Sequence, residues 1–310
     1  MYRLAHVTDP HFRSFAGAHL SDFLNKRAVG ALNIVVNRRR KHKMELLEAL
    51  GQDLRAQQPD HVALTGDLSN VAMEGEWRQA LRWIGATGTG PDAMTVIPGN
   101  HDAYVADVVE NHSFETLFAA YQSSDLSQGS SDLSRGSSGP SQGAPGTYPF
   151  VRLRGPLALV AINSCVATGD LGAWGTIGEG QLARVEALLR GPALADRTRV
   201  VLLHHPPVKL KGGEDRNLRD RDAFAAMLGR AGAELVLHGH DHRDETATLP
   251  GPGGRAIPVV GAGSASYAGS AEKRARYNVY EFDGPRVTRV TRAHDEDRDA
   301  FVEVRREPLG

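Results

Sequence analysis

The chain has 310 residues, a formal net charge of −1 and an isoelectric point near 6.9, and this balance argues against a dedicated nucleic-acid-binding protein. The length fits two average domains, but α/β proteins of this size often form one, and we expect a single domain over residues 1–310. The single cysteine excludes an intrachain disulfide framework, and the absence of a signal-peptide pattern and of any run of roughly 18 apolar residues favours a cytoplasmic location.

Strand-like and helix-like patterns alternate along the first three quarters of the chain. Short β-type runs predict strands at 4–8, 62–65, 95–97, 200–203 and 235–237. Apolar residues at helical spacing predict helices around 44–54, 77–84, 182–189 and 224–228. Strand patterns then follow one another at 257–260, 277–282, 287–293 and 301–304. Helices alternating with strands, followed by strands alone, fit two packed sheets flanked by helices.

Two segments depart from this pattern. Residues 122–146 are almost entirely Ser, Gly, Asp, Gln and Pro, and the sequence of 124–130 is repeated nearly unchanged at 131–137. Such a segment has too little apolar surface to order itself, which predicts a flexible insertion; a mobile lid over the active site is the alternative. Residues 19–43 combine apolar side chains with seven Lys and Arg. This basic amphipathic segment is either a solvated charge run capping a core helix or a surface for anionic lipid or an acidic substrate.

Five polar motifs stand at the ends of the first five strand-like runs. They are Asp9-Pro10-His11, Gly66-Asp67, Gly99-Asn100-His101-Asp102, His204-His205-Pro206 and Gly239-His240-Asp241-His242. Side chains at strand ends converge in the crevice where open α/β sheets bind ligands. Their mixture of carboxylate, amide and imidazole groups suits Fe, Mn, Zn or Co rather than Mg or Ca.

With these motifs in this order, the chain resembles the calcineurin-like metallophosphoesterases from residue 2 to about residue 282. Pro10 is a departure, because the family more often has an aliphatic residue or Thr there. The resemblance implies an α/β fold, the four-layer α/β/β/α sandwich of two mixed β-sheets flanked by helices. It also implies two metal ions bridged by Asp67. The remaining implied ligands are Asp9, His11 and His242 for one ion, and Asn100, His204 and His240 for the other.

The resemblance further implies hydrolysis by direct attack of a metal-bound hydroxide on phosphorus. His101 would stabilise the phosphoryl oxygens or protonate the leaving group, and Asp102 is expected to orient it. Because adjacent strand residues point to opposite faces, we expect His205 to support the ligands or face the substrate instead of binding an ion. The histidines without motif context are expected at the surface or in the core: His6, His19, His42, His61, His112 and His294.

The motif combination most resembles the bacterial class III cyclic-nucleotide and glycerophosphodiester phosphodiesterases. We therefore expect a phosphodiesterase that hydrolyses a small phosphodiester of one of these two kinds. The alternative enzyme is a pyrophosphohydrolase on a lipid-linked nucleotide such as UDP-diacylglucosamine, which the basic segment at 19–43 supports. That segment also predicts peripheral contact with anionic lipid at the inner membrane face. A non-catalytic scaffold of the same fold is less favoured, because such proteins lose ligands that this chain retains.

Overall fold

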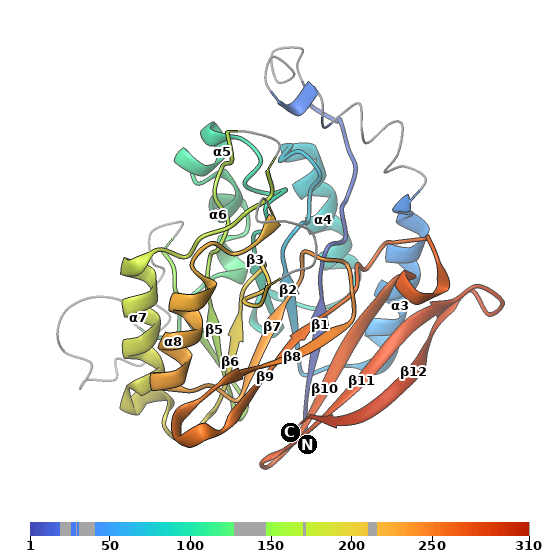
Figure 1. Ribbon diagram of the computed structural model, residues 1–310. Helices are drawn as coiled ribbons and strands as arrows, with labels where there is room; N and C mark the ends of the chain where they lie inside the picture. The colour runs from blue at the N-terminus through green and yellow to red at the C-terminus, as the bar shows by residue number, and fades with distance from the viewer. Residues whose placement is uncertain are drawn as a thin grey trace.

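The computed structural model describes residues 1–18, 26–28, 30, 41–126, 147–169, 172–209 and 216–309. Two six-stranded β-sheets stack face to face, with helices on the outer side of each sheet (Figure 1). Both sheets contain parallel and antiparallel neighbours. The predicted four-layer α/β fold of two mixed sheets is therefore confirmed.

The first sheet has the strand order β12-β11-β10-β1-β2-β3. Its strands are β1 (Tyr2–Val7), β2 (His61–Thr65), β3 (Met94–Ile97), β10 (Arg276–Asp283), β11 (Arg286–Asp295) and β12 (Ala300–Leu309). Strands β1 to β3 run parallel, because helices connect them, whereas β10 to β12 form antiparallel hairpins. The helices of this half are α3 (Met44–Gln57), α4 (Glu74–Ala86), α5 (Ala106–Glu110) and α6 (Ser113–Leu117).

The second sheet has the strand order β4-β5-β6-β7-β9-β8. Its strands are β4 (Phe150–Arg154), β5 (Leu157–Ala161), β6 (Thr198–Leu202), β7 (Leu235–His238), β8 (Glu245–Pro250) and β9 (Ala256–Gly261). Its helices are α7 (Glu179–Arg190) and α8 (Arg221–Ala231). Short 3₁₀ turns lie at Pro91–Ala93, Ala119–Tyr121, Pro192–Leu194, Pro252–Gly254 and Ala271–Lys273. The sequence patterns did not predict β4, β5 or β8. Two of these, β4 and β8, are the edge strands of this sheet, where polar residues interrupt the apolar run, and β5 is a central strand.

Three apolar clusters fill the spaces between the layers. The middle cluster holds residues of both sheets, such as Leu4 and Leu159, with no helix between them. The two outer clusters join each sheet to its own helices, so that Val7 packs with Leu50 of α3 on one side of the molecule. Neighbouring residues of β1 thus enter different clusters, because successive side chains of a strand point to opposite faces. This double burial explains the continuous apolar runs that predicted the central strands.

The first residues of the predicted insertion at 122–146 are hydrogen-bonded to neighbouring strands. The Gln122 side chain donates a hydrogen bond to the Val96 carbonyl oxygen at 3.1 Å, and the Asp125 carboxylate accepts one from the Leu153 amide at 2.7 Å. Polar side chains of residues 122–126 thus bond to strands β3 and β4, while flexibility of the insertion at 122–146 stays a prediction. Residues 127–146 lie outside the described part of the chain, as do most residues of the basic segment at 19–43.

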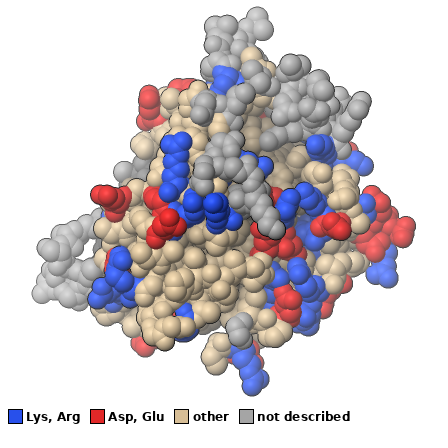
Figure 2. Space-filling model, viewed as in Figure 1, with Lys and Arg blue, Asp and Glu red and all other residues tan. Residues whose placement is uncertain are grey.

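Charged side chains of both signs lie side by side over the C-terminal strands, on the right of the view in Figure 2. Arg292 pairs with Asp53 at 2.6 Å, and Arg306 pairs with Glu281 at 2.6 Å. The described residues of this region therefore form no broad surface of a single sign. Among the described helices, none is both long enough and apolar enough to cross a membrane.

Candidate metal centre

The five predicted motifs come together at the carboxyl ends of strands from both sheets. In the first sheet they follow β1, β2 and β3, and in the second sheet they follow β6 and β7. The side chains of Asp9, His11, Asp67, His204 and His240 are all buried there. Distant segments thus place carboxylates and imidazoles in one enclosed region, where open α/β folds bind their ligands.

The turns that carry these side chains have an unusual backbone conformation. The φ angle is positive, between 49° and 75°, at five of the expected ligands: Asp9, His11, Asp67, His240 and His242. Residues other than glycine rarely adopt this region, and when they do they cluster at functional sites. Hydrogen bonds between the turns hold this backbone conformation. The Asp9 amide donates to the Gly66 carbonyl oxygen and the His11 amide to that of Asp67, each at 3.0 Å.

Glycine is required where the motif turns touch. A Cβ atom on Gly239 would lie 2.0 Å from Thr8 Oγ1 and 2.6 Å from Asp9 Oδ2. A Cβ atom on Gly99 would lie 2.2 Å from Asp67 Oδ1. A side chain on either glycine would therefore collide with an expected ligand, Asp9 or Asp67, so glycine is needed where the turns approach each other.

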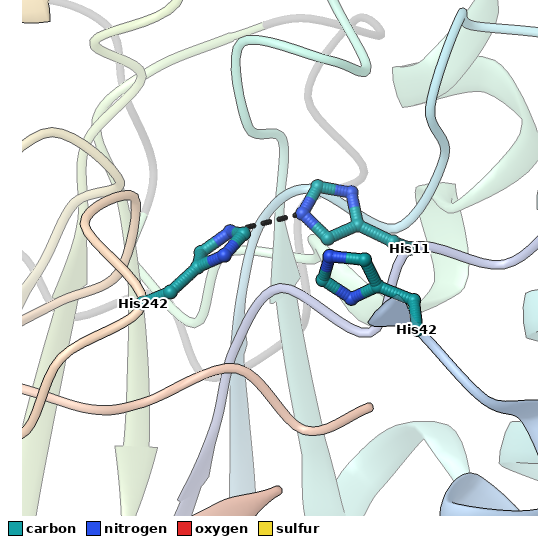
Figure 3. Close-up of side chains that lie close together, drawn as sticks. All are labelled: His11, His42 and His242. Atoms are coloured by element: carbon teal, nitrogen blue, oxygen red, sulfur yellow. Dashed lines mark hydrogen bonds between the residues drawn. The ribbon is translucent and has the colours of Figure 1, made fainter. Parts of the chain in front are cut away.

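The first group of expected ligands is Asp9, His11, Asp67 and His242, whose ligand-type atoms all lie within 4.8 Å of one another. His11 Nδ1 lies 3.2 Å from the carbonyl oxygen of Ser69. Because a carbonyl can only accept, Nδ1 carries the proton and Nε2 presents a lone pair. That Nε2 lies 3.0 Å from Nε2 of His242 (Figure 3).

The carboxylate of Asp9 keeps a negative charge in this buried position. Burial by itself raises the pKa of Asp9, but the neighbouring His242 and a hydrogen bond from Thr8 hold it well below its ordinary value. Oδ1 of Asp9 lies 3.2 Å from His242 Nε2, and Oδ2 accepts the Thr8 hydroxyl at 2.6 Å. A buried anion facing imidazole nitrogens is a favourable environment for a bound cation.

The second group is Asn100, His204 and His240. His204 Nδ1 donates to the Thr65 carbonyl oxygen at 2.8 Å, and His240 Nε2 donates to that of Arg216 at 3.0 Å. The opposite ring nitrogens therefore present lone pairs, 3.1 Å and 2.8 Å from Asn100 Oδ1. Burial lowers the pKa of both rings, so protonation of either is disfavoured. Asn100 Oδ1 and these two ring nitrogens are all hydrogen-bond acceptors, so none of them can donate to another. Such a group of atoms suits a metal cation.

Asp67 lies between the two groups. Its Oδ1 is 3.4 Å from His204 Nε2, and its Oδ2 is 3.8 Å from His11 Nε2. The backbone amide of His101 also donates to Oδ1 at 2.8 Å, which fixes the carboxylate in this orientation. One carboxylate thus offers an oxygen to each group, as a bridging ligand must.

His101 stands beside both groups and is only partly buried. Its Nδ1 lies 2.6 Å from the carbonyl oxygen of Asn70, and its ring stacks on Tyr104 with centroids 5.8 Å apart. The ring centroid of His11 is 5.2 Å away. Because a carbonyl can only accept, Nδ1 carries the ring proton and Nε2 presents a lone pair.

Asp102 does not have the expected contact with the His101 ring. Its buried carboxylate instead accepts hydrogen bonds from the turns after β2 and β3 and from α4, namely from the amides of Leu68, Ser69 and Gly99, the Ser69 hydroxyl and the Trp77 indole. The His101 ring thus bonds to Asn70 while Asp102 joins the two turns, and the role of Asp102 in orienting His101 stays a prediction. Burial raises the pKa of Asp102 against the lowering effect of these donors.

His205 packs behind the second group. Its Nδ1 lies 2.9 Å from Ser164 Oγ and its Nε2 lies 3.2 Å from the Ala173 carbonyl oxygen. The ring is fully buried, with its centroid 4.6 Å from that of His240. Of the two expectations for His205, the structure favours support of a neighbouring ligand over contact with substrate.

His42 is the residue that sequence reasoning missed. It was expected at the surface or in the core, yet its ring centroid lies 4.7 Å from that of His11 and 5.5 Å from that of His242 (Figure 3). An isolated β-bridge pairs His42 with Tyr267, which follows β9 in the chain, and this pairing places His42 beside the two rings. No motif surrounds His42, so local sequence contained no signal for this position.

A family model described as calcineurin-like phosphoesterase matches residues 2–244. No protein with a curated description matches the chain. Solved structures do: a dimetal phosphatase from Danio rerio is 12% identical with a TM-score of 0.58, covering 98% of each chain. Purple acid phosphatase PPD1 from yellow lupin is 11% identical with a TM-score of 0.59, covering 97% of this chain and 52% of that one. GAP50 of Plasmodium, described as the anchor in the inner membrane complex, is 12% identical with a TM-score of 0.51, covering 100% and 88%. These three likenesses show the fold alone.

Proposed function

Because the chain belongs to the calcineurin-like phosphoesterase family, we propose that it is a dinuclear-metal phosphoric ester hydrolase acting on a small phosphodiester. The position of Asp67 carries the proposal, since its two oxygens face separate groups of ligands at 3.4 Å and 3.8 Å. Two bound ions would neutralise charge on the phosphoryl oxygens and lower the pKa of a bound water towards about 7. Fe, Mn, Zn and Co all suit these mixed ligands.

The chain's own residues act on the substrate through position and proton transfer. Carbonyl oxygens hold the rings of His11, His204 and His240 in one tautomer, so their ligand nitrogens need little reorganisation. His101 is the proposed general acid, because its Nδ1–H is held by Asn70 and its Nε2 can carry a proton to the leaving group.

The preference for a diester rests on the combination of motifs, as in the class III phosphodiesterases. A cyclic nucleotide and a glycerophosphodiester are the two proposed substrates. Both release an alkoxide, which needs a proton, and the role proposed for His101 is to provide it.

A lipid-linked nucleotide is the second candidate substrate, and one observation favours it. Lys26, in the basic segment, lies with Nζ 4.4 Å above the centroid of the Tyr104 ring, which itself stacks on His101. Lys26 also donates to the Thr168 carbonyl oxygen at 2.7 Å. Lys26 therefore lies at the flank of the proposed general acid, where it would contact an extended anionic substrate.

A hydrolysis panel on the Mn-loaded protein tests these proposals. It contains bis(p-nitrophenyl) phosphate, p-nitrophenyl phosphate, cyclic nucleotides, glycerophosphodiesters and UDP-diacylglucosamine, with Asp67→Ala as the matched inactive variant. We expect turnover of diesters that chelators abolish. Turnover of the monoester alone contradicts a phosphodiesterase, and preferential cleavage of the UDP-lipid selects the second candidate. Two bound metals with no turnover of any substrate would indicate a scaffold.

A further inference from the structure

We propose that His42 is an additional ligand of the ion held by Asp9, His11, Asp67 and His242. This inference rests on the proposed metal centre and adds a residue that no motif of the chain contains. It gives one ion three imidazole ligands, whereas the other ion has only those of His204 and His240.

The first argument is geometric. His11, His42 and His242 each offer a ring nitrogen, and these three atoms lie within 4.8 Å of one another. His11 and His242 also belong to the group formed with the two carboxylates, so the two groups share two rings, and an ion held by those rings would lie beside His42. Figure 3 shows the His42 ring below that of His11, with one of its nitrogens directed toward the space between His11 and His242.

The second argument concerns the other nitrogen of the ring. Nδ1 of His42 lies 2.9 Å from Ser266 Oγ, which leaves Nε2 as the atom on the side of His11 and His242. Metal-binding histidines usually hydrogen-bond through the nitrogen that does not bind the metal, and this bond fixes the ring. His11, His204 and His240 follow the same arrangement with carbonyl oxygens.

The third argument is the rigid placement of the ring. The Lys43 amide donates to the Ser266 carbonyl oxygen at 2.9 Å, and the Ala268 amide donates to that of Lys41 at 2.6 Å. These two bonds on either side of His42 pair it with the turn after β9, and only 4% of its surface is exposed. The side chain is therefore positioned in advance, so little conformational entropy remains to be lost on ligation.

An extra imidazole should make the two ions unequal. Imidazole ligands favour Zn, Fe and related transition metals over Mg and Ca, so this site should bind its ion more tightly than the site with Asn100. The first equivalent of metal is then expected at the His42 side, and the second beside Asn100.

Anomalous diffraction from Zn-loaded wild-type crystals tests ligation directly and needs no variant. We expect His42 Nε2 at about 2.0–2.1 Å from the first ion, the usual Zn–N distance. A water molecule between His42 and the ion, or a separation above about 3 Å, overturns the proposal. If no ion binds at all, the metal centre itself fails, and the two failures are thus distinguishable.

Metal titration of His42→Gln provides the second measurement, because glutamine keeps a polar group of similar length beside Ser266. Loss of a direct ligand should weaken the first site beyond the roughly 10- to 100-fold typical of supporting residues, with the second site nearly unchanged. The control is His112→Asn, which removes an exposed histidine at a positive φ that Asn tolerates. Equal weakening of both sites, or an unchanged first site, contradicts ligation by His42.

Discussion

His101 donates its Nδ1 proton to the carbonyl oxygen of Asn70 across 2.6 Å, and this bond determines which ring nitrogen faces the reaction. Asn70 is itself fixed, since its side-chain amide donates to the Phe12 carbonyl oxygen at 2.7 Å. The proposed general acid is therefore oriented by backbone of the turn after β2, while its own amide holds Asp67. His101 thus contributes to both proposed roles with different atoms: its backbone amide holds the bridging Asp67, and its ring would donate the proton.

Substitution of the neighbours Asn100 and His101 should separate metal binding from proton transfer. His101→Ala should retain both metals but lose about 10²- to 10⁴-fold in turnover, the usual contribution of a positioned proton donor. Asn100→Ala should weaken one metal site, and added metal should partly restore its activity. Turnover and metal content measured together distinguish the two.

The leaving group provides the control for this prediction. The loss in His101→Ala should be smaller for p-nitrophenolate, which needs no proton, than for an alkoxide. Equal impairment of both classes, or loss of metal, would show that His101 is an electrostatic stabiliser or a ligand.

Replacement of Asp102 should lower stability. Asp102→Asn puts an amide donor against buried N–H groups, including those of Leu68 and Gly99. We expect the free energy of unfolding to fall by about 2 kcal/mol or more, since each unsatisfied buried group costs about 1–3 kcal/mol. Urea denaturation measures it, with the exposed Asp196→Asn as control. Unchanged stability together with reduced proton transfer would instead support the prediction that Asp102 orients His101.

Two glycine substitutions should have contrasting effects: one should weaken metal binding, and the other should stabilise the fold. Gly239→Ala places a Cβ atom 2.0 Å from Thr8 Oγ1, so Thr8 and Asp9 must shift and metal affinity should fall at the site of Asp9. Gly229→Ala, in helix α8, meets its nearest atom at 3.7 Å and should stabilise the protein by about 0.5–1 kcal/mol. Metal titration and thermal unfolding of both variants check the pair. Normal metal binding by Gly239→Ala would show that the turns do not need this close approach.

His61 should contribute to acid sensitivity. Burial, together with the charges of Arg152 and Arg154, lowers the pKa of His61 from 6.5 to about 2. Between these values the unfolded chain binds a proton that the folded chain does not, so stability is present above about pH 6.5 and is lost as pH falls. For one proton the slope approaches 1.4 kcal/mol per pH unit, as an order-of-magnitude figure.

His61→Gln keeps a donor for Thr95 Oγ1, which lies 2.8 Å from His61 Nε2, but does not titrate. Urea midpoints between pH 5 and 7 should therefore change less steeply with pH in this variant. Some slope should remain, because burial lowers the pKa of His6 to about 3 in the same sense. A slope identical to that of the wild type would exclude His61 as a source.

The basic segment should bind anionic lipid if it is more than a solvated charge run. Arg38, Arg39 and Arg40 lie outside the described residues, while Lys41 is exposed. We expect binding to vesicles containing acidic lipid that weakens as salt rises, because such attraction is screened. Replacing all four by Gln should abolish binding, whereas Arg286→Gln with Arg298→Gln, two exposed sites elsewhere, should not. No binding by the wild type at low salt would leave only the solvated run.

Local sequence was sufficient for most of the central strands, β5 excepted, and for the order of the motifs. Strands buried on both faces give continuous apolar runs, and the polar motifs follow them directly. These motifs carry the family resemblance that predicted which side chains would meet. Edge strand β8 was not predicted, because a strand with one exposed face and a terminal Pro250 has little apolar pattern to detect.

Tertiary structure decided everything that depends on backbone carbonyls and on pairing between distant turns. The sequence named His204 and His240, but only the carbonyl oxygens of Thr65 and Arg216 determine which ring nitrogen presents a lone pair. Every residue has a carbonyl group, so such partners leave no trace in residue type. His42 reached His11 for the same reason: main-chain hydrogen bonds with the turn after β9 placed it, and these bonds follow from the folded path of the chain and not from its local sequence.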